Sequence, residues 1–197
     1  MKLPSIQISV FYILPLLLLI SVLAYFAVRP YKKSSDNSPA AVYSSGIPLT
    51  PAMLDNPVIQ MIENAFAQQE WHYQTYPEDD NHTAHFILKL TGEKEKMTVH
   101  VVVDIDSDQY VINAVPDNID PLDESQIPSA LITMNSFNNK SCCAFLALTD
   151  RGKLIVTCGV NTDDKAYSTE SFLVNLSAVT TAVDTETSRI YNPNSNN

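Results

Sequence analysis

Near the start of the chain, 26 consecutive residues carry no charge, from Leu3 to Val28. A helix rises 1.5 Å per residue, so roughly 20 apolar residues cross a hydrocarbon layer about 30 Å thick. Pro15 would disrupt a soluble helix but is tolerated in a membrane helix. The run therefore predicts a transmembrane anchor over residues 1–28. A cleaved signal peptide is the alternative, because the stretch Val22 to Ala24 offers small residues near its end.

Basic residues follow the apolar run more densely than they precede it. Arg29, Lys32 and Lys33 come after it, whereas Lys2 alone comes before it. The more positive flank of a membrane helix prefers the cytoplasm, so we expect a single-pass protein of the inner (cell) membrane with a cytoplasmic domain. The odd number of cysteines, three, agrees with a reducing compartment. Residues 29–49 are rich in Ser and Pro and predict a basic flank followed by a flexible linker.

The remainder of the chain is strongly acidic. After residue 48 there are eight basic and 21 acidic residues, a net charge of −13. Such a surface repels phosphate backbones, so we expect no nucleic-acid partner. About 149 residues remain, which is the usual length of one domain and enough to bury a core. We expect that domain at residues 50–192, with a disordered tail at residues 193–197.

Hydrophobic periodicity predicts the elements of this domain. Thr50 and Asn56 each stand before a proline, as helix-capping residues do, and an amphipathic helix follows to about Gln69. Strict alternation from Met97 to Ile105 predicts a strand with one buried face. Further strands are expected at residues 85–90, 110–115, 144–148 and 154–160, and further helices at residues 127–137 and 172–183. The order helix, three antiparallel strands, helix, two-strand hairpin, helix predicts an α+β fold with the sheet packed on helices.

Four segments in this order resemble the YbjN family of proposed bacterial sensory transduction regulators. They are Trp71-His72-Tyr73 closing the first helix, the strand MTVHVVVDID, residues 134–138 ending the middle helix, and the hairpin AFLALTDRGKLIVTCGV. The resemblance covers residues 52–192. It implies a fold similar to type III secretion chaperones and a protein-binding domain that is not an enzyme, with no catalytic residue to carry over.

Two groups of side chains could hold a metal ion. Asp104, Asp106 and Asp108 imitate the start of a calcium loop, but Gln109 stands where that loop needs glycine. We therefore expect an acidic turn. His82 and His85 lie beside three acidic residues, Glu78, Asp79 and Asp80. A spacing of three in an extended segment sends the two rings to opposite faces, so we expect a surface loop there.

The remaining chemistry-bearing residues are cysteines, histidines and aromatic residues. Cys142 and Cys143 could form a vicinal disulfide or bind a soft metal, yet ordinary packing as small apolar residues is the expectation. Trp71 and Tyr73 could form a recognition surface, but packing between helix and sheet is favoured. Four glycines, none in a phosphate-binding spacing, exclude a P-loop and a dinucleotide fingerprint. No local signature points to a nucleophile and base among the histidines, which are His72, His82, His85 and His100.

The sequence thus predicts a membrane-anchored, non-enzymatic domain that binds a protein partner, with a homodimer as one form of that binding. No cofactor, metal or catalytic residue is assigned. The alternative is a small-ligand or metal sensor built on the same scaffold, and an enzyme is the third hypothesis. A sensor or an enzyme would need polar or titratable groups that converge in one place.

Overall fold

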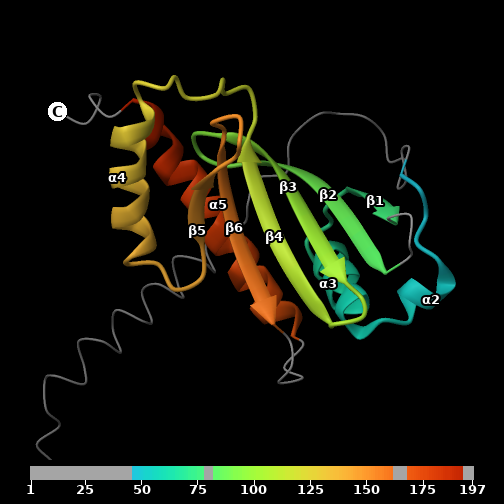
Figure 1. The fold of residues 1–197 in the computed structure, drawn as a ribbon. Coiled ribbons are helices and arrows are strands. Elements are labelled where there is room, and N and C mark those ends of the chain that lie inside the picture. The colour runs from blue at the N-terminus through green and yellow to red at the C-terminus, as the bar shows by residue number, and fades with distance from the viewer. Residues whose placement is uncertain (1–45, 78–81, 162–167, 193–197) are drawn as a thin grey trace, which may run out of the picture. The chain divides into compact units, whose positions relative to one another are not determined.

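The computed structural model describes residues 46–77, 82–161 and 168–192, which form an α+β domain (Figure 1). A six-stranded antiparallel sheet has the order β1-β2-β3-β4-β6-β5. The strands are β1 Tyr73–Pro77, β2 Thr83–Thr91, β3 Lys96–Asp104, β4 Gln109–Pro116, β5 Phe145–Leu148 and β6 Leu154–Asn161. The helices are α2 Pro51–Leu54, α3 Pro57–Gln68, α4 Ile127–Asn138 and α5 Thr169–Tyr191.

Within these ranges, no helix is both long enough and apolar enough to cross a membrane. The expected anchor at residues 1–28 lies outside the described residues, and so does the expected tail at residues 193–197.

The first two helices begin as their capping residues predict. The Thr50 hydroxyl accepts the backbone N–H of Met53 at 3.4 Å, and the Asn56 side-chain oxygen accepts those of Val58 at 2.9 Å and Ile59 at 3.2 Å. A proline follows each cap, where its missing N–H costs no helical hydrogen bond. Both predicted starts are confirmed.

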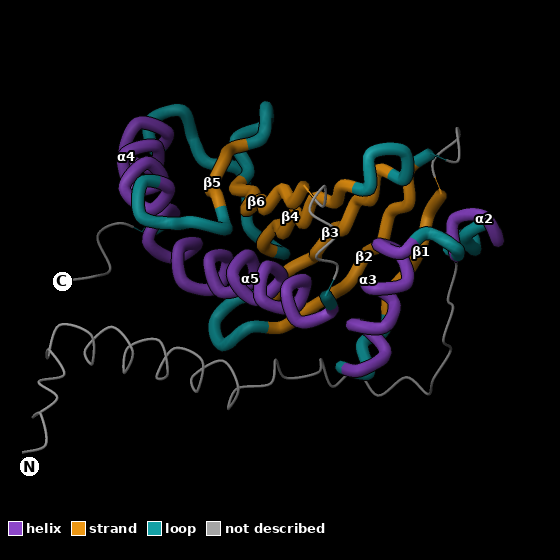
Figure 2. The backbone as a smooth tube through the Cα atoms, turned by 90° about the horizontal axis from the view of Figure 1, so that it is seen from below, coloured by secondary structure: helices purple, strands orange, loops and turns teal. Residues whose placement is uncertain are grey.

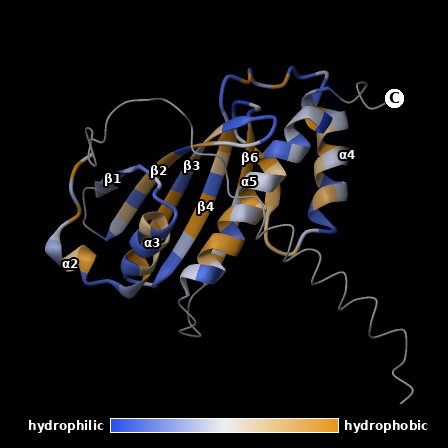
Figure 3. Cartoon of the chain, turned by 180° about the vertical axis from the view of Figure 1, so that it is seen from behind, coloured by the Kyte–Doolittle hydropathy of each residue, from blue (hydrophilic) through white to orange (hydrophobic). Residues whose placement is uncertain are grey.

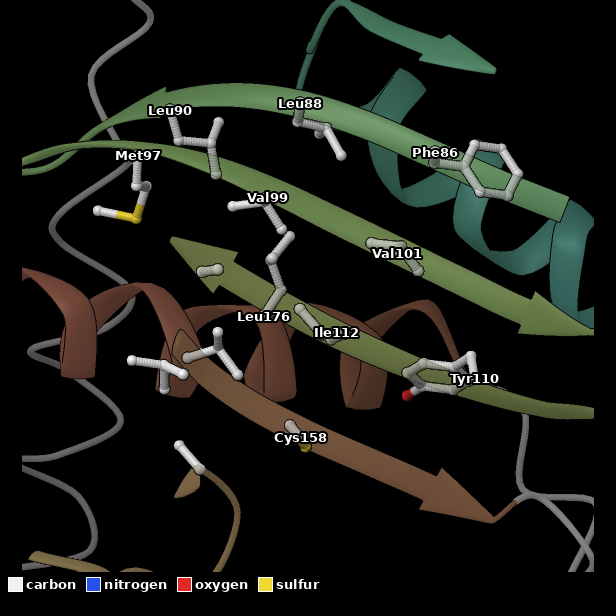
Figure 4. Packing of buried hydrophobic residues seen from close by; sticks show 14 of the residues in the cluster. Phe86, Leu88, Leu90, Met97, Val99, Val101, Tyr110, Ile112, Cys158 and Leu176 are labelled. Carbon is white, nitrogen blue, oxygen red and sulfur yellow. The ribbon is translucent and has the colours of Figure 1, made fainter. Parts of the chain in front are cut away.

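The alternating pattern of β3 is confirmed as the centre of the core. Met97, Val99, Val101 and Val103 are fully buried, and the side chains between them point to the other face. Ile105, predicted to continue the row, lies in the turn after the strand and is half-buried. Figure 4 shows the inward side chains of β2, β3 and β4 facing Leu176 of α5.

Two helices cover one face of the sheet. Helix α5 runs across β3, β4 and β6, and α3 lies beside it over the β1–β2 side (Figure 2). Phe66 of α3 packs edge-on against Phe86 of β2 and Phe172 of α5, with ring centroids 5.8 and 5.7 Å apart. Figure 3 shows both helices crossing the strands, whose hydropathy alternates from residue to residue. The prediction of helices packed on one face is confirmed.

The predicted number of strands was wrong, because β1 was read as the end of the first helix. That helix ends at Gln68, and Glu70 takes a left-handed φ of 52°. The Trp71 N–H then bonds to the Phe66 carbonyl at 2.9 Å and the Glu70 N–H to that of Ala67 at 3.1 Å. These two bonds form a Schellman end, which usually places glycine where Glu70 stands. Four strands therefore precede α4 instead of three.

The predicted flexible linker, residues 29–49, was wrong at its C-terminal end, because residues 46–49 pack on the domain. Leu49 is buried in the core, and the Thr75 hydroxyl of β1 donates to the Ile47 carbonyl at 3.2 Å. A Cβ on Gly46 would lie 2.7 Å from the Thr75 carbonyl oxygen, so this approach requires glycine. The segment thereby covers the outer edge of β1.

A carboxylate on α5 holds the turn between β2 and β3. Asp184 is 8% exposed and accepts three backbone N–H groups, from Glu93 at 3.0 Å, Lys94 at 2.8 Å and Glu95 at 2.8 Å. Gly92 lies against it, and a Cβ there would come within 2.6 Å of the carboxylate carbon. This contact ties one end of the long central hairpin to the helix.

The opposite edge of the sheet is closed by a side chain of α4. The Asn138 amide donates to the Leu146 carbonyl at 2.9 Å and accepts the Leu146 N–H at 2.8 Å. These are the two groups that a further strand would use, so the amide protects the free edge of β5.

Candidate functional site on the open face of the sheet

The face of the sheet opposite α3 and α5 is the candidate functional site. No helix of the described residues lies across it (Figure 2). We call it the open face, and the register of the strands places 20 described side chains on it. They are Gln74, Tyr76, Thr83, His85, Ile87, Lys89, Thr91, Lys96, Thr98, His100, Val102, Asp104, Gln109, Val111, Asn113, Val115, Phe145, Ala147, Ile155 and Thr157.

Apolar side chains on several strands share the open face with polar ones. Val111 is 37% exposed and Phe145 is 45% exposed, and aliphatic side chains on four strands are half-buried around them. The chain has 21 acidic residues after residue 48. Among the outward-facing strand positions that the structure describes, Asp104 at the end of β3 is the one acidic residue. Uncharged side chains near the centre, with Lys89, Lys96 and Asp104 toward the strand ends, resemble the core and rim of a protein interface.

Two histidines meet near the middle of this face. His85 lies opposite Val102 and His100 lies opposite Ile87, so the two are diagonal neighbours on adjacent strands. Nε2 of His85 lies 3.0 Å from Nδ1 of His100, and the ring centroids are 5.1 Å apart. One ring donates its N–H to the unprotonated nitrogen of the other.

The surroundings of His100 favour a neutral ring. Burial lowers the pKa of His100 below its ordinary value of 6.5, and the charge of a protonated His85 would lower that pKa further. A protonated His100 would also face a like charge across the 3.0 Å contact if His85 were protonated. At neutral pH His100 is therefore an uncharged imidazole with one lone pair available.

The pairing of His85 with His100 was missed from the sequence. The alternation of β3 puts His100 on the surface opposite the apolar row. It is on that face, but it is half-buried and hydrogen-bonded to His85. The signal was the short turn between the two strands: a hairpin that pairs Thr91 with Lys96 must bring residue 87 opposite residue 100. Counting back from the turn would have placed the rings together.

His82 and His85, which were expected in a surface loop and not in a metal cluster, lie in different settings: His82 is exposed before β2, and His85 lies within that strand. His82 lies outside β2, and its Nδ1 pairs with the Asp106 carboxylate at 2.9 Å, away from His85. Glu78, Asp79 and Asp80 are outside the residues that the structure describes.

The acidic turn after β3 uses its carboxylates on other partners. Asp104 accepts the N–H groups of Asp106 at 3.1 Å and Ser107 at 3.4 Å, and Asp108 accepts the Asn56 amide at 3.0 Å. The hydrogen bonds to Ser107 and Asp106 hold the pKa of Asp104 below its usual value. In the described parts of the chain, no three His, Cys, Asp or Glu side chains converge as a metal site.

The prediction that Cys142 and Cys143 both pack as small apolar residues was wrong. Cys142 is exposed and Cys143 half-buried in the loop before β5, with their sulfurs 3.2 Å apart as free thiols. The hydrogen bond to Cys142 and burial raise the pKa of Cys143. Cys158 on β6 is the cysteine that packs in the core, where burial raises its pKa to about 11. The surroundings of Cys143 and Cys158 therefore do not activate these two thiols as nucleophiles.

The expected core packing of the two aromatic residues after α3 is confirmed. Trp71 and Tyr73 are half-buried, with ring centroids 6.3 and 4.9 Å from that of Phe66. Tyr73 also donates its hydroxyl to Glu63 at 3.1 Å. The remaining histidine, His72, is exposed in the loop between them.

Neither the models of protein families nor the curated proteins contain a match to this sequence. The resemblance to the YbjN family therefore stays a prediction that rests on the four segments quoted above.

Proposed function

We propose that this chain is a membrane-anchored protein whose domain binds another protein through the open face and performs no chemistry. The observation that carries the proposal is the open face itself, where Val111 and Phe145 remain exposed on a sheet whose other face is covered by helices. Exposed apolar side chains on one face of a sheet can serve as a docking surface for another protein.

The charge pattern supports a partner of complementary character. The centre of the open face lacks carboxylates among its described residues, whereas Asp104, Asp106 and Asp108 gather at one end. An apolar partner surface flanked by basic residues fits that arrangement, and a domain with a net charge of −13 would steer it during encounter. The anchor at residues 1–28, the cytoplasmic placement and the YbjN resemblance belong to the same proposal.

The second candidate function, a sensor of a metal or small ligand, has one observation in its favour. The His85 and His100 imidazoles present adjacent nitrogens on the open face, 3.0 Å apart. Catalysis has no comparable support, since the histidines and thiols do not assemble with an oriented base in the described residues.

Photocrosslinking in native membranes tests the protein-binding proposal. A benzoylphenylalanine placed at Val111 or at Phe145 should give a discrete crosslinked adduct. The matched control is Val174, which is apolar and 55% exposed but lies on α5, on the other side of the sheet. Adducts of equal yield from all three positions, or from Val174 alone, would contradict the proposal.

Two further measurements separate the parts of the proposal. Mass spectrometry of the adduct distinguishes a second copy of this chain from a different protein, and both outcomes agree with binding through the open face. A reporter fused after Asn197 should be active only in the cytoplasm. Activity of the reporter outside would overturn the orientation and leave the binding face untouched.

A further inference from the structure

We propose that the imidazoles of His85 and His100 form a two-ligand site for a divalent transition metal, Cu²⁺, Ni²⁺ or Zn²⁺, on the open face of the sheet. The inference does not depend on the protein-binding proposal, because metal binding can be measured without any partner.

The distance between the two nitrogens already suits a shared metal ion. Imidazole nitrogens bind zinc at about 2.0–2.1 Å, so two of them at bond angles near 90–110° lie roughly 2.9–3.4 Å apart. Nε2 of His85 and Nδ1 of His100 are 3.0 Å apart. A small rotation of each ring would turn the two nitrogens from one another toward a common point above the sheet.

The backbone holds the two rings in place before any ion arrives. His85 and His100 stand on β2 and β3, which pair along nine residues between flanking strands on both sides. The second metal bond is then formed within one rigid unit, and a pair of ligands fixed in this way binds as a chelate. A pair of histidines on a mobile loop would lose this advantage.

The neighbours of the pair select the class of metal. The residues directly opposite the two histidines on adjacent strands are Tyr76, Val102, Ile87 and Asn113, and none of these is a carboxylate. A site with imidazoles as its protein ligands favours Cu²⁺, Ni²⁺ and Zn²⁺ over Mg²⁺ and Ca²⁺, which prefer oxygen. Two protein ligands leave coordination positions for water or for a donor from outside.

The proton between the two imidazoles does not prevent metal binding at neutral pH. In the hydrogen-bonded pair, one of the two facing nitrogens carries a proton. When the metal binds, that ring moves this proton to its other nitrogen through solvent and remains neutral. Both facing lone pairs then bind the ion, and no net charge is lost from the protein.

Metal titration of the full-length chain without an affinity tag tests the site. Cys142 and Cys143 are first replaced by serine so that thiols do not compete. Cu²⁺ or Ni²⁺ should then bind with one tight equivalent, and Mg²⁺ in excess should not displace it. His85→Gln and His100→Gln should each weaken binding at least tenfold, whereas His72→Gln, at an exposed histidine outside the pair, should change the affinity less than twofold.

The proposal is overturned if the parent chain binds Cu²⁺ no more tightly than the His85→Gln, His100→Gln double variant, or if His72→Gln weakens binding as much as His100→Gln. A further measurement uses the parent chain alone and so does not depend on how the variants fold. Electron paramagnetic resonance of the one-equivalent Cu²⁺ complex should show coupling to two imidazole nitrogens, and coupling to one nitrogen alone would refute the paired site.

Discussion

Replacing Asp184 with alanine should destabilise the domain more than its position near the end of a surface helix suggests. The carboxylate is 8% exposed and accepts three backbone N–H groups of the turn after β2. The turn and the helix are about 90 residues apart in the sequence, so this contact is tertiary. Asp184→Ala would release one end of the β2–β3 hairpin from α5.

The expected loss follows from the hydrogen bonds. A bond to a charged group contributes about 1.5–3 kcal/mol net, so three independent bonds would contribute roughly 4.5–9 kcal/mol. The three share one carboxylate, and Glu93 and Lys94 are exposed, so water can satisfy their N–H groups after the change. We therefore expect Asp184→Ala to cost about 3 kcal/mol, a large part of the ~5–15 kcal/mol that holds a typical domain folded.

Urea unfolding followed by tryptophan fluorescence measures this loss. Trp71 is the chain's single tryptophan and packs half-buried against Phe66, so its emission reports on the domain. With a urea dependence of about 2 kcal/mol per molar, the midpoint should fall by about 1.5 M. The matched control is Thr185→Ala at the next, exposed position, which should change the unfolding free energy by less than about 0.5 kcal/mol.

A double-mutant cycle with Gly92 gives the sharper test. Gly92→Ala should cost about 2 kcal/mol in the parent chain, because its Cβ would collide with the Asp184 carboxylate. In the Asp184→Ala background that carboxylate is gone, so the same change should cost far less. Additive effects, or a loss below about 0.5 kcal/mol for Asp184→Ala, would refute this account of the turn.

Four other predictions follow from the described contacts. Val101→Asp should prevent folding, because it buries an unpaired charge, whereas His100→Asp on the open face should keep a native circular dichroism spectrum. The unfolding free energy should fall as pH drops through about 6.5, because the pKa of His100 is lowered in the folded domain and the unfolded chain therefore binds a proton there more readily. His100→Gln should flatten this pH dependence, and an unchanged slope in the variant would contradict the prediction. Asn138→Ala should cost about 1–2 kcal/mol and speed hydrogen exchange at the Leu146 amide, and unaltered exchange would show that the edge is protected otherwise. Glu70→Gly should raise the urea midpoint by the equivalent of about 1 kcal/mol, since glycine takes a left-handed φ without strain, and a lower midpoint would contradict this.

Much of the secondary structure could be predicted from the sequence, because it depends on neighbours a few residues apart. The side chains of Thr50 and Asn56 cap helices that start at the next residue. In β3 the alternation from Met97 to Val103 decides which face is buried, since a shift of one residue would turn the whole apolar row into water. The α+β class and the burial of one sheet face followed from these local patterns.

Strand β1 escaped prediction because its own residues carry a weak signal. Its buried inward position, Thr75, is polar and packs under the segment at residues 46–49. The helix before it ends at a left-handed Glu70, where the usual glycine is missing. Both features become favourable only when β2 and the preceding segment are in place, so tertiary contacts decide them.

The candidate site depends still more on tertiary structure. His85 and His100 are 15 positions apart in the sequence, and a one-residue change in the register of the hairpin would point their rings to opposite faces. Asp184 reaches the turn at Glu93 across 91 residues. Local sequence determines which face each side chain occupies within its own strand or helix, whereas the register and packing of distant elements determine which of these side chains meet.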